Sequence, residues 1–447
     1  MTATLEAAQL LADPTLGGVR ELLRADAPRT ITRFVTSRGW TVHGLRAVQI
    51  AYQPERTCLV RYNVRAEDRS GALRRLSVCI ETRAEPRPMP DPHSSWVDRY
   101  DFPDPVERLD GYQLWHYPYD PSLKSLQDAA SGRFVRDALR ETPQNALAVS
   151  VKATRYRPRR RATLRYELFH GKDAAEARST LFAKVMRTSR ARDALGLAES
   201  LTDSRGTLSR LLTRSRLSEP TLRLSLPCAT MGGRVLLFDP MPGRSLLQLL
   251  LEDRPLPRPE RVTKLLDQVG SFERHGITSV AHRHRRSPDE VARSTSDVLL
   301  HLAPEVAQSV EAVVTAVDLG SETDRVPRRI VHGDLYEAQI FVTDDFAMGL
   351  IDLDDLGVGD PALDAANFTA HLLALAASRP AARQRILAYR GLLRASFLER
   401  LDISSDDLAW REALVMMQLA VGPWRTLQAD WPRRVVELTA VAARLVA

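Results

Sequence analysis

Ile330-Val-His-Gly-Asp-Leu-Tyr-Glu-Ala-Gln-Ile-Phe-Val342 carries the strongest signal in this sequence. Apolar residues at both of its ends predict two short strands, and the loop between them presents His332, Asp334 and Gln339. A further strand pattern follows and ends on Asp352. The sequence therefore predicts two carboxylates at neighbouring strand ends, with an amide oxygen between them.

Phosphoryl transfer requires such a set of groups. A carboxylate accepts the proton of the hydroxyl that is phosphorylated or orients that hydroxyl, hard oxygen ligands hold Mg²⁺ on the phosphates, and a cation grips the phosphate chain. Asp334, together with Asp352 and Gln339, supplies the first two parts. The alternative for each aspartate is a turn residue, since aspartate is common in turns.

Lys184 is the candidate for the cation. It lies in the apolar run Leu181-Phe-Ala-Lys-Val-Met186, and an ammonium group that is buried without a partner is costly. The alternative is a lysine on a solvent-facing strand position, whose long side chain reaches water.

Three motifs together resemble the signature of a known superfamily. They are His332-Gly-Asp334-x4-Gln339, Ile351-Asp352 and Gly359-Asp360-Pro361-x2-Asp364. The set is similar to that of the aminoglycoside-phosphotransferase/choline-kinase superfamily, a relative of the protein kinases. The resemblance implies that Asp334 is the catalytic base, Asp352 the main magnesium ligand and Gln339 the second metal ligand.

The resemblance also implies supporting roles and a branch of the superfamily. His332 is expected to brace the catalytic loop, while Asp360 and Asp364 are expected to orient it. Gln339 stands where the superfamily usually has asparagine, and it offers the same amide oxygen on a side chain that is one methylene longer. Maltokinase-like sugar kinases also carry glutamine there, so the resemblance leans toward the sugar-kinase branches.

Nucleotide-binding residues are implied by the same resemblance. Lys184 is expected to hold the ATP phosphates, and Glu199 is nominated as its ion-pair partner. Residues 236–246 are similar to the hinge that joins the two lobes in the superfamily. Backbone groups near Phe238 and Met241 are therefore expected to meet adenine.

A glycine-rich phosphate loop is absent at the expected place. The chain reads Tyr156-Arg-Pro-Arg-Arg-Arg-Ala-Thr163 there, without a glycine that would allow close backbone approach. The arginines at 159–161 either help to grip phosphate by charge or form a solvated basic turn, and the sequence leaves both open.

An internal repeat is predicted at an offset of 104 residues. The matching pairs are Tyr52 and Tyr156, Pro54 and Pro158, Arg56 and Arg160, Arg61 and Arg165, Tyr62 and Tyr166, Arg74 and Arg178, and Arg83 and Arg187. Coincidence is the alternative because arginine is abundant, although it explains the tyrosine and proline matches less easily. At this offset Ile80 stands where the second copy has Lys184, so the first copy is expected to be a structural cap.

Length and composition bound the architecture. The chain has 447 residues, of which 44% are apolar and 27% charged, and this length favours two or three domains. No apolar run is long enough to span a membrane, and the N-terminus does not resemble a secretory signal. Three widely spaced cysteines match neither a disulfide framework nor a zinc motif. A cytoplasmic protein is therefore expected.

The net charge of +7 comes mainly from arginines that are scattered among acidic residues. No nucleic-acid-binding motif accompanies them, so nucleic acid is not expected as a partner. Attraction of an anionic substrate such as ATP explains the same charge.

Strands gather early in the chain and helices gather late, which predicts an α+β fold. With the resemblance, the predicted architecture is a two-lobed protein-kinase-like fold with an additional N-terminal α/β cap. The cap is assigned to residues 1–145, the β-rich nucleotide-binding lobe to 146–238 and the helical lobe to 239–447. The cap is interpreted as a degenerate copy of the strand unit of that lobe.

The predicted function is phosphorylation by ATP and Mg²⁺ of a hydroxyl on a small polar molecule, such as a sugar, an amino sugar or an aminoglycoside. A catalytically weak, pseudokinase-like ATP-binding protein is the alternative. A protein kinase is disfavoured, because Gly359-Asp360-Pro361 follows Asp352 after only six residues and leaves no room for a peptide-binding segment. No membrane partner is expected, and neither the acceptor nor the oligomeric state can be read from the sequence.

Overall fold

The computed structural model describes residues 13, 15, 16, 19, 22, 26–85, 87–93, 95–109, 111–171, 178–203, 222–232, 234–272 and 286–447. The chain divides into two compact units. The first contains residues 1–191, 228–239 and 422–434, and the second contains residues 192–227, 240–421 and 435–447. Among the described helices, none combines the length and apolar character that crossing a membrane requires.

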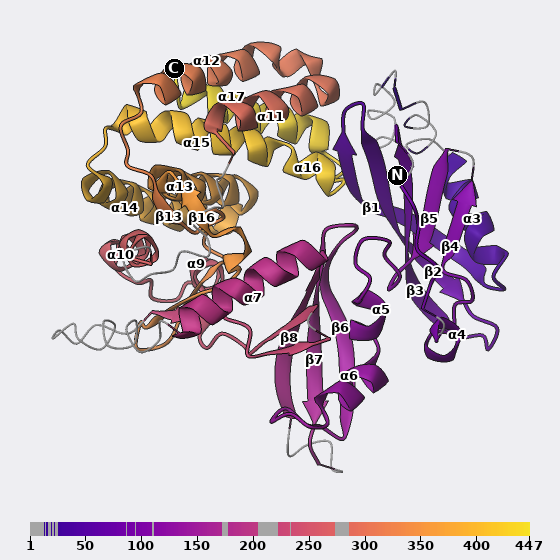
Figure 1. The fold of residues 1–447 in the computed structure, drawn as a ribbon. Coiled ribbons are helices and arrows are strands. Elements are labelled where there is room, and N and C mark those ends of the chain that lie inside the picture. The colour runs from indigo at the N-terminus through magenta and orange to yellow at the C-terminus, as the bar shows by residue number, and fades with distance from the viewer. Residues whose placement is uncertain are drawn as a thin grey trace. The chain divides into compact units, whose positions relative to one another are not determined.

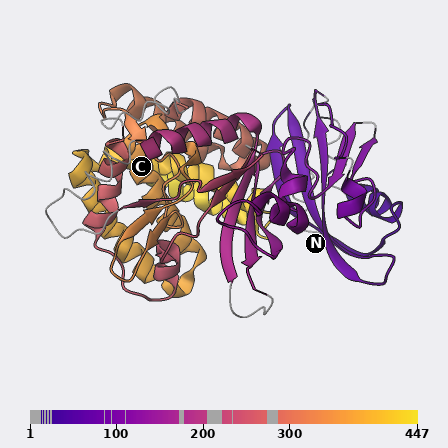
Figure 2. The same cartoon turned by 60° about the horizontal axis from the view of Figure 1, so that its bottom comes forward.

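The first unit contains two five-stranded antiparallel sheets (Figure 1, Figure 2). The first sheet has the strand order β1-β2-β3-β5-β4, with β1 (Thr41–Gln53), β2 (Thr57–Glu67), β3 (Leu73–Arg83), β4 (Val106–Leu109) and β5 (Tyr112–His116). The second has the order β6-β7-β8-β11-β10, with β6 (Ala148–Arg157), β7 (Arg161–Phe169), β8 (Arg178–Met186), β10 (Ala229–Met231) and β11 (Val235–Phe238). When the strands of each sheet are counted along the chain, the two orders are the same.

Alternating side chains explain why these segments form strands. In β7, Ala162, Leu164, Tyr166 and Leu168 are buried, while the residues between them are more exposed. Successive side chains of a strand point to opposite faces, so this period of two buries one face of the sheet.

Helices cover the sheets of the first unit. They are α3 (Asp26–Thr36), α4 (Trp96–Arg99), α5 (Leu126–Ala129), α6 (Gly132–Leu139) and α16 (Gly422–Arg425). Helix α6 begins with Ser131 as its N-cap and lies so close to β6 that a Cβ on Gly132 would be 2.3 Å from the carbonyl oxygen of Val149. Glycine is required at that position by the close approach.

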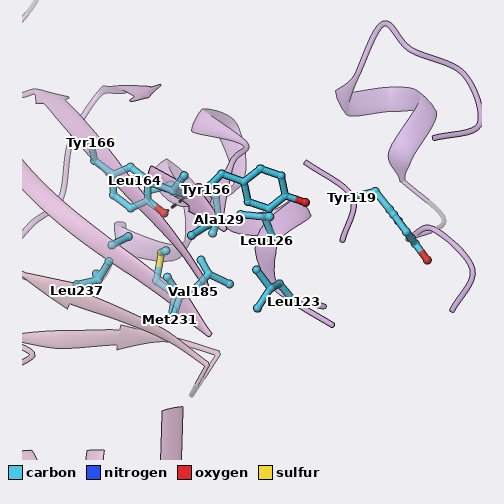
Figure 3. Packing of buried hydrophobic residues seen from close by; sticks show 14 of the residues in the cluster. Tyr119, Leu123, Leu126, Ala129, Tyr156, Leu164, Tyr166, Val185, Met231 and Leu237 are labelled. Atoms are coloured by element: carbon cyan, nitrogen blue, oxygen red, sulfur yellow. Dashed lines mark hydrogen bonds between the residues drawn. The ribbon is translucent and has the colours of Figure 1, made fainter. Parts of the chain in front are cut away.

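One hydrophobic core joins the two sheets of the first unit. Figure 3 shows part of it, with Tyr156 and Tyr166 of the second sheet beside Leu126 and Ala129 of α5. The same core includes Trp115 of the first sheet, whose indole nitrogen donates a hydrogen bond to the hydroxyl of Tyr156 at 3.1 Å. The two sheets therefore share buried surface, which stabilises them together.

The first turn of the first sheet is held by Asp13. Its Oδ2 accepts hydrogen bonds from the hydroxyl of Tyr52 at 2.9 Å and from the backbone N–H of Glu55 at 2.7 Å. Its Oδ1 accepts from the backbone N–H groups of Thr15 and Leu16. Glu55 has φ 59°, a conformation that residues other than glycine rarely adopt.

The second sheet repeats this arrangement with Asp120. Its Oδ2 accepts from the hydroxyl of Tyr156 at 2.8 Å and from the backbone N–H of Arg159 at 2.8 Å. Its Oδ1 accepts from the backbone N–H groups of Ser122 and Leu123. Arg159 has φ 61° and so shares the unusual backbone conformation of Glu55. The two sheets thus share a buried turn network as well as a strand order, while their origin by duplication stays a prediction.

The pairing of the third strand corrects one detail of the predicted repeat. Thr57 pairs with Arg83 in the first sheet, whereas Arg161, its counterpart at the offset of 104, pairs with Met186 rather than residue 187. The third strand is therefore displaced by one residue. The position of Lys184 corresponds to Glu81 in the first sheet, and the alignment with Ile80 is wrong.

The second unit is mainly helical. Its strands are β9 (Arg223–Leu224), β12 (Arg244–Ser245), β14 (Ile340–Val342) and β15 (Met348–Leu350) in one sheet, and β13 (Arg329–Val331) and β16 (Gly357–Gly359) in another. Its helices are α9 (Leu246–Leu251), α10 (Pro259–Gly270), α11 (Pro288–Leu302), α12 (Ala307–Thr323), α13 (Pro361–Ser378), α14 (Arg383–Leu401) and α15 (Ser405–Ala420), with 3-10 turns at Pro304–Val306, Leu353–Asp355 and Pro380–Ala382. Helices α7 (Thr188–Asp203) and α17 (Trp431–Arg444) contain two of the points at which the chain changes unit.

Helix α13 is the centre of the helical unit. It packs against α14 and α15 (Figure 1), and ten of its residues are buried. A helix that is apolar on most sides is stable only in such a position. The strand-rich first part and the helical second part confirm the predicted α+β fold with an additional N-terminal segment, whereas the division at residues 145 and 238 remains a prediction.

We expect acid sensitivity from His116, which lies at the end of β5. Its ring stacks on Phe102 with 4.3 Å between centroids, and burial, with the nearby charge of Arg38, lowers its pKa to about 3. Between pH 6.5 and 3 the unfolded chain binds a proton that the folded chain does not, so stability is lost as the pH falls. Replacing His116 by Phe should remove roughly 3 kcal/mol of this loss at pH 4. The measurement is urea unfolding of both proteins at pH 7 and pH 4, and an equal loss in both would contradict it.

Candidate active site

The loop predicted from residues 330–342 is formed between two strand pairs of the second unit. Strand β13 precedes it and pairs with β16, while β14 follows it and pairs with β15. The pairing of Ile340 with Leu350 brings the end of the loop beside the end of β15. The strands on both sides of the loop were predicted from their apolar residues, whereas β16 was not.

Asp364 holds the start of this loop. Its two carboxylate oxygens accept hydrogen bonds from the backbone N–H groups of His332 at 2.7 Å and Gly333 at 2.8 Å. The carboxylate is buried, with 3% of the residue exposed. Gly333 has φ 83°, which lets two successive N–H groups point at one carboxylate. Helix α13 thereby fixes the loop through its first turn.

His332 braces the loop from within. It is fully buried; its Nε2 lies 3.0 Å from the carbonyl oxygen of Ile351, and its Nδ1 accepts a hydrogen bond from the backbone N–H of Asp334 at 3.3 Å. A carbonyl oxygen can only accept, so Nε2 carries the proton and Nδ1 is free to accept. The side chain therefore ties the backbone at Asp334 to the end of β15.

Gln339 and Asp352 meet at the other end of the loop. The backbone N–H of Ile351 donates to the carbonyl oxygen of Gln339 at 3.1 Å, and the side-chain Nε2 of Gln339 donates to Oδ2 of Asp352 at 3.4 Å. Asp352 has φ 61° and ψ 50°, the left-handed conformation. Strained backbone of this kind is concentrated at functional sites.

This pair fits the requirements of a magnesium ion. Mg²⁺ prefers oxygen ligands and commonly takes only one or two carboxylates from the protein. The carboxylate of Asp352 and the side-chain amide of the buried Gln339 lie side by side, with the amide nitrogen 3.4 Å from the carboxylate oxygen. These two residues are the candidates for holding the ion.

A second buried network supports the start of α13. Asp360 is the N-cap, and its Oδ1 accepts from the backbone N–H of Ala362 at 2.8 Å. Its Oδ2 lies 2.5 Å from Nε of Arg411, and Nη2 of Arg411 lies 2.7 Å from Oδ1 of Asp324. Burial raises the pKa of Asp360, and the Arg411 guanidinium opposes that shift. The role of Arg411 could not be predicted from the sequence, because the two carboxylates that it binds are 51 and 87 residues away along the chain.

Two further residues of α13 contact the loop and were not predicted. Nδ2 of Asn367 donates to the carbonyl oxygen of Leu335 at 2.9 Å. The ring of His371 stacks on Tyr336 with 4.4 Å between centroids, and burial lowers the pKa of His371 to about 4. The spacing 360, 364, 367 and 371 follows the helical period, so one face of α13 lines the loop.

Lys184 and Phe238 lie in the first unit. Lys184 is half-buried on β8 and pairs with Leu236 of β11. Its Nζ is 5.3 Å from the ring centroid of Phe238, within the range of a cation–π contact. The structure therefore brings together these two predicted residues.

Met241 and Glu199 belong to the second unit. Met241 is half-buried against Gly349, where a Cβ would be only 2.3 Å from its Sδ. Glu199 is exposed on α7. The adenine contact of Met241 and the pairing of Glu199 with Lys184 remain predictions.

Comparison with known proteins gave a family match and several structural likenesses. The model of the phosphotransferase enzyme family matches residues 173–402. Solved structures similar to the chain include a choline kinase from Streptococcus pneumoniae, at 10% identity over 70% of this chain and 98% of that one, with a TM-score of 0.44. They also include a macrolide 2'-phosphotransferase from Brachybacterium faecium, at 14% identity over 68% and 97%, with a TM-score of 0.38. The sequence matches none of the curated proteins compared with it.

We expect Asp364 to be essential to the loop. Replacing it by Asn removes one acceptor oxygen and leaves a buried N–H group without a partner, which should lower the free energy of unfolding by about 2 kcal/mol. The matched control is Asp344→Asn in the exposed turn after β14. Urea unfolding of both variants tests the assignment, and equal stability of the two would contradict it.

Proposed function

Because the chain belongs to the phosphotransferase enzyme family, we propose that it transfers the γ-phosphoryl group of ATP to a hydroxyl of a small polar molecule. The observation that carries the proposal is the loop anchored by Asp364. It holds Asp334 near its tip and sets Asp352 beside Gln339 at its end. A loop that is held by backbone hydrogen bonds, with one carboxylate on it and a second beside its end, suits a reaction that depends on positioning and electrostatics.

Asp334 is the proposed catalytic base. It is half-buried, and the hydrogen bond from its backbone N–H to Nδ1 of His332 holds its backbone in place. Its carboxylate would accept the proton of the acceptor hydroxyl as that oxygen bonds to the γ-phosphorus. The bond from the γ-phosphorus to the bridging oxygen breaks, and ADP leaves with the electron pair.

Asp352 and Gln339 are the proposed holders of Mg²⁺. When bound, the ion would neutralise charge that develops on the phosphates. Asp352 is held in its left-handed conformation by the turn Leu353–Asp355 that follows, and Gln339 is buried. The amide of Gln339 would turn its oxygen toward the ion, and the carboxylate of Asp352 would bind from the other side.

Lys184 is the proposed grip on the nucleotide phosphates. It lies within the matched part of the chain, and its contact with Phe238 keeps the ammonium group on that face of the sheet. Backbone groups near Phe238 and Met241 are proposed to meet adenine, and Glu199 is proposed to pair with Lys184.

The acceptor is proposed to be a sugar, an amino sugar, an aminoglycoside or a related antibiotic or metabolite. Relatives with solved structures carry the names choline kinase, ethanolamine kinase and macrolide phosphotransferase, which extends the set worth testing. The described cysteines are free, as expected of a protein in the reducing cytoplasm. Neither nucleic acid nor a membrane is proposed as a partner.

Replacing Asp334 by Asn should abolish transfer and spare ATP binding. The amide cannot take the proton, so turnover should fall by at least about a hundredfold. Mg-ATP binding, measured by calorimetry, should match that of the wild type and of the Asp344→Asn control. Wild-type turnover in the Asp334 variant would remove this residue from the mechanism.

The acceptor class can be identified by measuring ADP release from Mg-ATP in the presence of each candidate acceptor. The candidates are sugars, amino sugars, aminoglycosides, macrolides, nucleosides, choline and ethanolamine. Release that depends on one class and is lost in Asp334→Asn supports the proposal and names the class. Binding of ATP without release on any of them favours the pseudokinase alternative.

A further inference from the structure

Glu81 occupies, in the first sheet, the position that Lys184 has in the second. Each lies on the third strand of its sheet; Glu81 pairs with Gln113 of β5, and Lys184 pairs with Leu236 of β11. Where the second sheet has a cation, the first has an anion. The first sheet therefore lacks a phosphate-gripping lysine there, and its carboxylate, 2% exposed, requires a partner inside the protein.

The partner of Glu81 comes from the other sheet. Nη2 of Arg159, in the turn between β6 and β7, lies 2.5 Å from Oε2 of Glu81, and both side chains are buried. Oε1 of Glu81 also lies 3.1 Å from Nη1 of Arg83. A buried charge pair of this kind ties the turn of one sheet to the third strand of the other, because separating the two charges inside the protein would lose their mutual attraction.

Arg159 is held at four further points. Its backbone N–H donates to Asp120 at 2.8 Å, and its carbonyl oxygen accepts from Nε of Arg187 at 2.9 Å. Its Nη2 donates to Oε1 of Gln113 at 2.8 Å, and its guanidinium lies 5.0 Å from the ring centroid of Trp115. The left-handed backbone at Arg159 persists because its surroundings over-determine it. Arg159 is thus committed to the protein interior and is not available to a ligand.

The inward direction of Arg159 leaves Arg160 at the surface. Arg160 and Arg187 are both exposed, and in the described part of the chain neither forms an ion pair with a carboxylate. Burial, with the charges of Arg87 and Arg160, lowers the pKa of Arg187. The charge of Asp120 partly opposes that shift, so positive charge predominates at this turn, and such charge attracts an anion.

The turn lies within reach of Lys184. Arg161, the first residue of β7, pairs with Met186, which is two residues along β8 from Lys184. At a rise of about 3.4 Å per residue, the turn begins about 7 Å along the sheet from Lys184. A phosphate chain that is gripped by Lys184 could therefore extend to Arg160.

We propose that Glu81 is a positioning residue for the nucleotide phosphates. By holding Arg159 inward, it fixes the turn of residues 157–160 so that Arg160 faces the phosphate chain. A turn fixed by charge thus takes the place of the absent glycine-rich loop, and the first sheet serves the nucleotide site without binding nucleotide itself. This proposal rests on the proposed ATP-dependent function.

Calorimetric titration of the full chain with Mg-ATP and with adenosine tests it. Glu81→Gln keeps the size of the side chain and removes the charge that holds Arg159. Binding of Mg-ATP should weaken about tenfold, while binding of adenosine, which has no phosphates, should not change. The matched control is Glu107→Gln, which breaks a different ion pair of the first sheet, with Arg38, and should leave both affinities as in the wild type.

Two further variants separate positioning from stability. Replacing the pair by Glu81→Leu with Arg159→Met removes both of its buried charges and leaves only Arg83, which is 15% exposed, without its carboxylate. Stability should therefore recover in large part relative to Glu81→Gln, while Mg-ATP binding stays weak. Arg160→Gln removes only an exposed charge and should weaken Mg-ATP binding without lowering Tm.

Three results would overturn the proposal. They are unchanged Mg-ATP affinity in Arg160→Gln, recovery of affinity together with stability in the double variant, and equal weakening of ATP and adenosine in Glu81→Gln. If the wild-type chain binds no Mg-ATP, the proposed function itself is wrong and the positioning role falls with it.

Discussion

The carboxylate of Asp364, bound by two successive backbone N–H groups, is the interaction on which the second unit depends. Those N–H groups belong to His332 and Gly333, at the start of the loop that carries the proposed base. Asp364 lies in the first turn of α13, whose N-cap is Asp360, and Arg411 of α15 pairs with Asp360. The packing of the helices therefore determines where the loop lies, and the proposed catalytic residues are positioned by the helical core.

In the first unit, buried carboxylates hold turns between strands. Two sheets of equal strand order share one core, and each has its first turn held by an aspartate, Asp13 or Asp120. What distinguishes them is the third strand, which carries Glu81 in one sheet and Lys184 in the other. In the proposal made above, Glu81 of the first sheet fixes the turn at Arg159 of the second through a charge pair.

Local patterns in the sequence predicted much of this structure, and long-range contacts account for what they missed. The loop of residues 330–342 could be predicted because apolar runs flank it and its polar spacing is short. The roles of Arg411 and Glu81 could not, because their partners are distant in sequence and depend on packing. Identities at a fixed offset predicted the repeat, but the third strand of the second sheet is displaced by one residue in its pairing. Lys184 therefore corresponds to Glu81 and not to Ile80. Register depends on turn geometry, which identity at a fixed offset does not reveal.

Transfer of a phosphoryl group from ATP to a small molecule, as we propose for this chain, can be tested by following the label of γ-labelled ATP, with magnesium present, in a protein-free extract of small metabolites. We expect label in a phosphate monoester of a small molecule with the wild-type chain. Label that appears only in inorganic phosphate, or on protein, would contradict it.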